Sequence, residues 1–240
     1  MLDPEPAGRT PPTHATPPSV LGSTGETSPH ALQILMTEHW SLLGTRSMGY
    51  VEAMARASMF IAALSGGVVA LALVAQATDF GDPFVAFSLV LLPVVFFLGV
   101  VTIVRLTQVG WEDAVWIQGM NRIRNAYLEL APELEPYFVT SRHDDAPGIM
   151  LSSIARTRMP GRFQALVAIP GVVAVLDSVV AGAVFGIGAL ALDAGTATSI
   201  VIGAAAFVLS IAGFIGFGAR AIAAYRRSLV ARFPTPPGPG

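Results

Sequence analysis

The chain has 240 residues, of which 53% are hydrophobic and only 12% are charged. A soluble globular domain carries about twice that share of charged residues, so the composition excludes an ordinary water-soluble enzyme. The charged residues are 16 Asp or Glu and 14 Arg, with no Lys, which gives a net charge of −2. The absence of cysteine excludes disulfides, thiolate catalysis and Cys-ligated zinc or iron–sulfur sites.

The apolar residues gather in four long blocks rather than spreading evenly along the chain. Residues 58–76 and 84–104 carry no charge, and each approaches the ~20 residues with which a helix crosses ~30 Å of hydrocarbon. A third block over residues 163–191 contains one charge, Asp177, and a fourth over residues 198–219 contains none. Because backbone groups inside hydrocarbon must bond to one another, these blocks predict four transmembrane helices.

Short polar connections join these spans in pairs. About seven residues separate the first two blocks, and a similar few around Asp193 separate the last two. The sequence therefore predicts an all-α membrane protein built from two tight hairpins, residues 58–104 and 163–219. Pro93 and Pro170 fall inside the predicted spans, where proline removes a backbone donor and predicts a kink.

The arginines are confined to particular segments of the chain. All 14 lie outside the two hairpin tips, which carry only the acidic residues Asp79, Asp82 and Asp193. By the positive-inside rule, we expect a multi-pass protein of the cell (inner) membrane, with both termini and residues 105–162 in the cytoplasm. Membrane lipid is the expected partner of the basic residues that flank the second hairpin, which are Arg156, Arg158, Arg162, Arg226 and Arg227.

The two ends of the chain differ in composition from the spans. Residues 1–28 are rich in Pro, Thr and Ser, which predicts a disordered cytoplasmic tail. Residues 220–240 begin with arginines and end in PTPPGPG, which predicts a basic segment followed by a second disordered tail.

Two amphipathic helices are predicted on the cytoplasmic side. Residues 29–57 are expected to form a helix that begins at Pro29 and continues into the first span. Its apolar stripe contains Leu32, Met36, Trp40, Leu43, Val51 and Met54. The second span is expected to continue inward, within the cytoplasmic segment 105–162, with a stripe of Leu106, Val109, Trp116, Met120, Ile123, Tyr127 and Leu130. We expect the two helices to pair and bury both stripes; the alternative is that each lies flat on the lipid surface.

The stretches LQILMTEHWSLLGTRS, MNRIRNAYLEL and PYFVTSRHDD resemble an actinobacterial family of four-span integral membrane proteins that are known as uncharacterised, hypothetical proteins. The resemblance covers residues 31–150. It implies that this region is one coherent unit, and it implies no activity or cofactor because the family has no assigned activity.

Asp177 is the sharpest candidate site residue. It lies about fourteen residues inside the third block, ~20 Å from the inner end and near the bilayer centre. Because a lone carboxylate there costs ~3 kcal/mol, we expect it to face the bundle, either protonated or bonded to Ser65, Thr102 or Ser210. One interpretation is an ion or proton site in a homo-oligomeric channel or carrier. The other is a protonated group that joins neighbouring helices.

Two further groups of residues are candidates on spacing alone. Gly182 and Gly186 in the third span, with Gly213 and Gly216 in the fourth, permit close helix packing, either within the chain or in an oligomer. The side chains of His143, Asp144 and Asp145 are weak candidate metal ligands. Because this cluster lacks a second histidine at helical spacing, we favour a solvated turn and predict no metal and no cofactor.

The sequence contains no Walker loop, GxSxG elbow or dinucleotide fingerprint, so we predict no enzyme. Nucleic acid is not an expected partner, because the basic clusters are small and adjoin the membrane. The leading hypothesis is a membrane-anchored interaction or regulatory protein. Its paired cytoplasmic helices would contact an unknown cytoplasmic protein partner or a second copy in a homo-oligomer. The alternative is a small homo-oligomeric ion or proton channel or carrier that uses Asp177.

Overall fold

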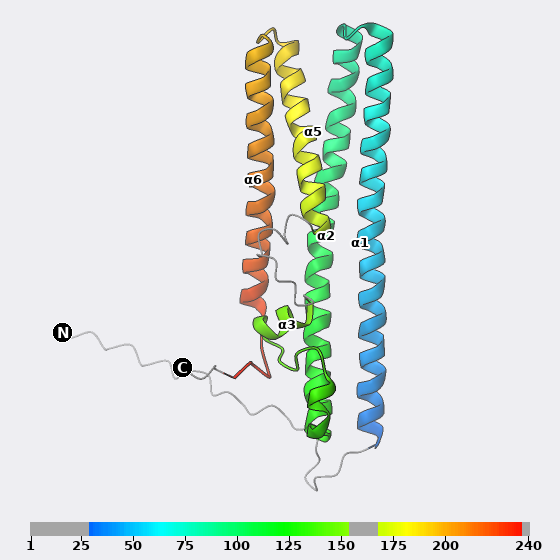
Figure 1. Cartoon of the computed structure of the whole chain (residues 1–240), viewed down its shortest axis with the longest axis vertical. Coiled ribbons are helices and arrows are strands. Elements are labelled where there is room, and N and C mark those ends of the chain that lie inside the picture. Colours follow the sequence, from blue (N-terminus) through cyan, green and yellow to red (C-terminus); the bar gives the residue numbers. More distant parts are fainter. Residues whose placement is uncertain (1–28, 154–167, 237–240) are drawn as a thin grey trace, which may run out of the picture.

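The computed structural model describes residues 29–153 and 168–236, and Figure 1 shows its arrangement. The predicted N-terminal tail and the last four residues lie outside this described part. The helices are α1 (Pro29–Thr78), α2 (Asp82–Leu130), the 3₁₀ helix η1 (Pro132–Tyr137), α3 (Ala146–Ser153), α5 (Ile169–Ala191) and α6 (Thr196–Ser228). Within the two described ranges there is no strand, and α1, α2, α5 and α6 are long and apolar enough to span a membrane. The predicted all-α, four-span membrane fold is confirmed.

The four spans form two antiparallel hairpins whose tips lie at the same end of the molecule (Figure 1). Only residues 79–81 connect α1 to α2, and only residues 192–195 connect α5 to α6. Asp79, Phe80 and Asp193 adopt left-handed backbone conformations, with φ of 48°, 57° and 58°. Aspartate tolerates this region better than most residues, so the acidic tips also suit the geometry of tight turns.

The first hairpin is much longer than a membrane is thick. α1 has 50 residues and α2 has 49, and at 1.5 Å per residue each is about 75 Å long. The hydrocarbon core of a bilayer is only about 30 Å thick, so roughly half of each helix projects beyond it. The two helices run side by side over their whole length (Figure 1). We call residues 29–57 the α1 extension and residues 105–130 the α2 extension.

The two extensions pair as expected, but the α1 extension does not use its predicted stripe. Its contact face contains buried or half-buried residues spaced three or four apart, namely Leu35, His39, Leu42, Arg46, Gly49 and Ala53. This spacing is that of an antiparallel coiled coil. The predicted stripe is exposed instead, from 37% at Leu32 to 70% at Trp40. The α2 stripe, by contrast, is buried or half-buried.

Small residues explain which face of α1 was selected. A Cβ atom added at Gly49 would lie only 2.8 Å from the indole of Trp116, so this glycine allows the large side chain of α2 to approach the α1 backbone. Ala53 continues the same face and is 9% exposed. The alternative in which both extensions lie flat on lipid is therefore wrong, because α1 is one continuous helix paired with α2 throughout.

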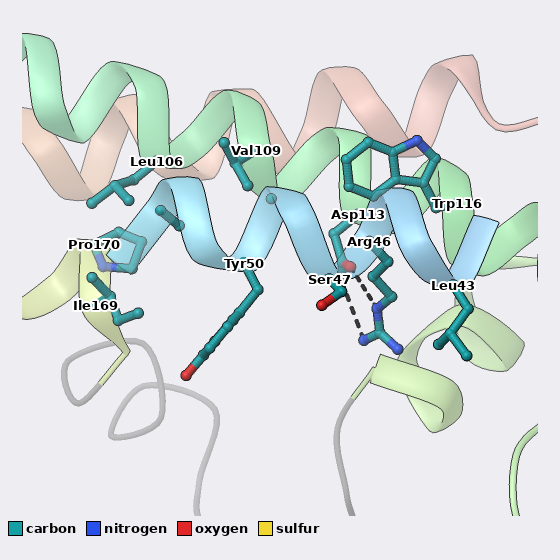
Figure 2. Close-up of a pocket in the computed structure, with 12 residues that line it drawn as sticks. Leu43, Arg46, Ser47, Tyr50, Leu106, Val109, Asp113, Trp116, Ile169 and Pro170 are labelled. Carbon is teal, nitrogen blue, oxygen red and sulfur yellow. Dashed lines mark hydrogen bonds and ion pairs between the residues drawn. The ribbon is translucent and has the colours of Figure 1, made fainter. Parts of the chain in front are cut away.

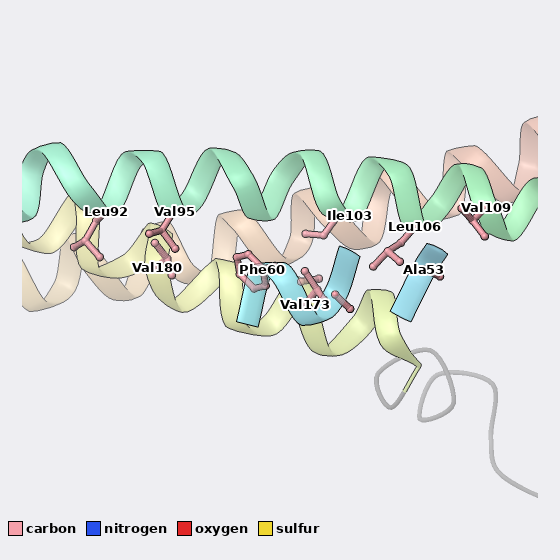
Figure 3. Packing of buried hydrophobic residues seen from close by; sticks show 11 residues of the cluster. Ala53, Phe60, Leu92, Val95, Ile103, Leu106, Val109, Val173 and Val180 are labelled. Atoms are coloured by element: carbon pink, nitrogen blue, oxygen red, sulfur yellow. The ribbon is translucent and has the colours of Figure 1, made fainter. Parts of the chain in front are cut away.

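α5 packs into the first hairpin and forms the main apolar core (Figure 3). The buried residues of this core are Ala53, Ala57, Phe60, Leu92, Val95, Ile103, Leu106, Val109, Val173, Ala174 and Val180. α6 packs mainly on α5, and its only buried residue is Ser199. The second hairpin is thus attached to the first chiefly through α5.

The third span begins later than predicted. α5 starts at Ile169, and the first residues of the predicted span lie outside the described ranges. Pro170 consequently occupies the first turn, where a backbone N–H has no intrahelical partner, and the predicted kink there is wrong. Asp177 lies eight residues, or about 12 Å, after the start of α5.

The glycines of the second hairpin divide into two groups. A Cβ atom at Gly182 would lie 2.9 Å from the carbonyl oxygen of Gly203, and one at Gly203 would lie 2.8 Å from that of Gly182. Gly186 faces Ser199 and Gly203 of α6 in the same way. Gly213 has no atom within 4 Å of such a Cβ, and Gly216 has only its own helix's Arg220 at 3.9 Å. Within the described chain, Gly213 and Gly216 therefore do not have the predicted packing role.

We predict that Gly203→Ala destabilises the protein by about 1–3 kcal/mol, because the added methyl group must push α5 and α6 apart. The matched control is Gly213→Ala in the same helix, where the new methyl group meets open space and alanine favours the helix. Thermal unfolding in mild detergent measures both variants. Equal losses of stability would contradict the assigned contact.

Candidate functional site

Asp177 lies where α1, α2 and α5 meet. Its side chain is completely buried, and its carboxyl group faces the backbone of Gly99 on α2. A Cβ atom at Gly99 would overlap the Asp177 carboxyl group and would also lie 2.8 Å from the ring of Phe60. Gly99 therefore forms the notch in α2 that accommodates the carboxyl group.

The partners expected for Asp177 do not bond to it. Neither carboxyl oxygen has a hydrogen-bond partner among the described residues. Thr102 donates its hydroxyl to the carbonyl of Leu98 at 2.7 Å, while Ser210 pairs with Ser178 at 3.2 Å. A buried, unpaired carboxylate is costly, so this enclosed contact suits the neutral acid better than an ion site open to water.

Ionic contacts join the two extensions beyond the apolar core. The guanidinium of Arg105 donates from Nε and Nη2 to the two carboxylate oxygens of Glu52, at 2.8 and 2.9 Å. Arg46 donates to Asp113 at 2.6 Å, again between α1 and α2. Hydrogen bonds from Arg105, and then from Arg56 at 3.0 Å, lower the pKa of Glu52 to about 2.

A groove of about 450 Å³, which we call the junction groove, lies beside these ion pairs (Figure 2). It is formed where the two extensions meet the start of α5, and its volume is in the range of ligand pockets. The labelled lining residues are Leu43, Arg46, Ser47, Tyr50, Leu106, Val109, Asp113, Trp116, Ile169 and Pro170. Leu43 and Tyr50 are also exposed on α1, so the groove continues onto the outer surface of that helix.

A second groove, of about 340 Å³, lies between α2 and α6 at the level of the spans. Its lining is apolar apart from Ser210, and it includes Phe96, Phe214 and Gly213. The open space at Gly213 is therefore the edge of a lateral groove, and its surroundings suit a lipid chain. Asp177 does not line this groove or the junction groove.

His143, Asp144 and Asp145 lie in the loop between η1 and α3, and this loop is not the solvated turn that we expected. Asp144 is completely buried. Its carboxylate accepts the backbone N–H groups of Arg232 and Phe233 at 2.7–3.0 Å, and Nε of Arg122 at 2.7 Å. Residues 232 and 233 follow α6, so the loop before α3 contacts the segment that follows α6.

Asp145 binds the same C-terminal segment. It accepts the backbone N–H of Thr235 at 2.8 Å and the Thr235 hydroxyl at 2.9 Å. It also accepts the N–H of Gly148 at 2.9 Å, which caps the start of α3. Burial raises the pKa of Asp145, but the hydrogen bonds from Thr235 and Gly148 outweigh it and lower the pKa overall.

These contacts change two sequence-based interpretations. Residues 229–236 of the predicted tail are held against α2 and the loop before α3 by hydrogen bonds to their backbone, and we call this segment the arm. The oxygens of Asp144 are engaged by N–H donors, so they do not face a metal position. Among the residues that the structure covers, no group of three His, Cys, Asp or Glu side chains could hold a metal ion.

The predicted lipid-contacting arginines are only partly described. Arg156, Arg158 and Arg162 lie outside the described residues. Arg226 and Arg227 are exposed in the last turn of α6, where positive charge also complements the helix dipole. Their exposure leaves them available to anionic headgroups.

The sequence alone did not identify Gly99, Gly203 or the contacts that hold the arm. Gly99 has a visible signal, because it is the only glycine in the second apolar block and stands among bulky residues. Gly203 is the first glycine of the fourth block, about one helical turn after Ser199. The arm has a subtler signal in its spaced prolines, Pro234 and Pro236. No protein-family model, curated protein or solved structure matches the chain. The functional interpretation therefore rests on the geometry of the chain itself.

We predict that Gly99→Ala lowers stability by about 1–3 kcal/mol, because its methyl group overlaps the Asp177 carboxyl group. Gly110→Ala, at an open position of the same helix, is the matched control and should not destabilise the protein. Adding Asp177→Ala to Gly99→Ala should recover part of the loss, since the two residues share one contact. Thermal unfolding of these three variants and of Asp177→Ala alone tests this, and additive losses would refute the contact.

The Glu52 contacts predict a pH effect of definite sign. Because Arg105 and Arg56 hold the pKa of Glu52 at about 2 instead of its ordinary 4.5, the ion pairs stabilise the fold above pH 4.5. This stabilisation is lost as the pH falls toward 2. The melting temperature should therefore fall less steeply over this interval in Glu52→Gln than in the wild type. Parallel pH profiles would show that the ion pairs add no stability.

Proposed function

We propose that this chain is a membrane-anchored interaction or regulatory protein that binds a cytoplasmic protein partner through its paired extensions. The observation that carries the proposal is an exposed apolar face on the α1 extension, which we call the outer stripe. It contains Leu32, Met36, Trp40, Leu43, Tyr50, Val51 and Met54, and each is between 37% and 70% exposed. Large contiguous apolar patches of this kind are typical of interaction surfaces.

The geometry of α1 favours a protein as the occupant of the outer stripe. Trp40 lies eighteen residues before residue 58, where the apolar block begins, which is about 27 Å along the continuous helix. A bilayer that surrounds the spans therefore does not cover most of the stripe. The residues of the outer stripe are spaced three and four apart, which fits an amphipathic partner helix. At the membrane-proximal end of the stripe, the junction groove could accept a side chain of that helix.

The ion pairs of the extensions support the same function. Arg105 with Glu52, and Arg46 with Asp113, fix the rotation of α1 against α2, so the outer stripe is held outward. A surface that is already ordered loses less conformational entropy when it binds. Because the hairpin tips carry acidic residues and no arginine, the positive-inside rule supports a cytoplasmic position for both extensions and both termini.

The channel or carrier alternative receives less support from the geometry. Asp177 contacts Gly99 and Phe60 inside the helix bundle, and it lines neither groove. We therefore propose that Asp177 joins α5 to the first hairpin as a neutral acid. Cation or proton flux into liposomes that disappears in Asp177→Asn would overturn this proposal in favour of the channel.

We predict that a photo-crosslinking amino acid placed at Trp40 or Tyr50 in living cells yields adducts of higher mass. The same amino acid at Thr45 is the matched control, because Thr45 is exposed on the opposite face of α1. An adduct of twice the chain mass would identify a second copy, and any other mass a different partner. Absence of adducts at Trp40 and Tyr50, or an equal yield at Thr45, would contradict the proposed surface.

A further inference from the structure

The arm is bound almost entirely through its backbone. The side chains of Gln118 and Arg122 donate to the carbonyl of Val230 at 3.3 and 2.8 Å. Asp144 accepts the N–H groups of Arg232 and Phe233, and its own N–H donates to the carbonyl of Phe233 at 3.2 Å. We call the four residues Gln118, Arg122, Asp144 and Asp145 the clasp.

Such contacts are those of a peptide-binding site. Main-chain hydrogen bonds supply affinity for an extended segment, and a few side-chain pockets supply selectivity. The apolar side-chain contact here is that of Leu229, which packs against the small apolar cluster of Ile117, Met120 and Ile149. The only side-chain hydrogen bond from the arm to the clasp is that of the Thr235 hydroxyl to Asp145.

The clasp is shaped by bonds that do not involve the arm. Asn121 is completely buried and donates to the carbonyl of His143 at 2.7 Å. Ser152 donates to Asn121 at 3.0 Å and accepts the N–H of Ser141 at 3.1 Å. The Ser141 hydroxyl in turn accepts the N–H of His143 at 3.0 Å. The loop that carries the two aspartates is therefore held by contacts that do not involve the arm.

The prolines of the arm match the donors that the clasp uses. The clasp accepts N–H groups at residues 232, 233 and 235. Proline, which has no N–H, stands at the two positions between and after them, Pro234 and Pro236. Prolines at these positions stiffen the arm in an extended form without removing a bond that the clasp makes. The spacing of the prolines thus fits a peptide bound to the clasp, whereas the sequence alone indicated a disordered tail.

We propose that the clasp is a receptor for an extended, proline-containing peptide, and that the chain's own arm is its displaceable occupant. The preferred ligand has an apolar residue at the position of Leu229, free N–H groups three, four and six residues later, and prolines only at other positions. The clasp lies on the α3 side of α2, while α1 lies on the other side (Figure 1). This site is therefore separate from the outer stripe and does not depend on the function proposed for it.

The test uses the full-length chain in mild detergent and a fluorescent peptide of residues 228–236. Arg232→Pro removes the N–H that donates to both oxygens of Asp144 and leaves every clasp residue unchanged. The matched control is Arg232→Ala, which keeps that N–H and alters only an exposed side chain.

Fluorescence anisotropy should show that Arg232→Pro binds the peptide at least about tenfold more tightly than the wild type or Arg232→Ala. The reason is that a tethered arm competes at an effective concentration near ~1 mM. Adding Asp144→Asn to Arg232→Pro should weaken binding by about tenfold or more, because charge-assisted bonds to three donors are lost.

A second peptide makes the test independent of how well the variants fold. In the wild-type chain, the unmodified peptide should displace the arm at high concentration, while a peptide with proline in place of residue 232 should not bind. Equal binding of the two peptides, or no binding of the unmodified peptide to any form of the chain, would overturn the proposal. Equal affinity of the wild type and Arg232→Pro would show that the arm does not occupy the clasp.

Discussion

The antiparallel contact between α1 and α2 is the constraint on which the rest of the molecule depends. Two antiparallel helices of about 75 Å stay in contact over their whole length only if the spacing of their facing residues matches throughout. Small residues such as Gly49 and Ala53 provide the close approach, and the pairs Arg46–Asp113 and Glu52–Arg105 set the register. The pairing of the two spans therefore continues beyond the membrane as a rigid pair of extensions.

The other elements attach to this pair through the apolar core and through two aspartate contacts. Within the spans, Asp177 of α5 enters the notch at Gly99, so a carboxyl group and a missing side chain position the second hairpin. Beyond the spans, Asp144 and Asp145 hold the arm that follows α6. Two attachment points at different heights restrain α6, which packs mainly on α5 and otherwise buries little of its surface. Release of the arm would remove one of these restraints.

The distribution of apolar surface links this architecture to function. In the α1 extension the contact face combines two leucines with small and polar residues, while most of the large apolar side chains are exposed. A helix that only needed to pair would bury those side chains, because apolar burial is the main source of stability. Their exposure on a rigid helix is the arrangement expected of a surface that another protein completes.

The sequence by itself determined the four spans, the two hairpins and the pairing of the extensions. Length, charge-free blocks and the placement of arginine suffice for these features, because the low polarity of a bilayer leaves few alternatives. Only the tertiary structure decided which face of α1 is buried, since a period of 3.5 or 3.6 residues permits either stripe and the choice rests on close approach at Gly49. The same holds for the notch at Gly99 and for Asp144. Each depends on a residue far away in the chain, and local pattern does not report contacts between distant segments.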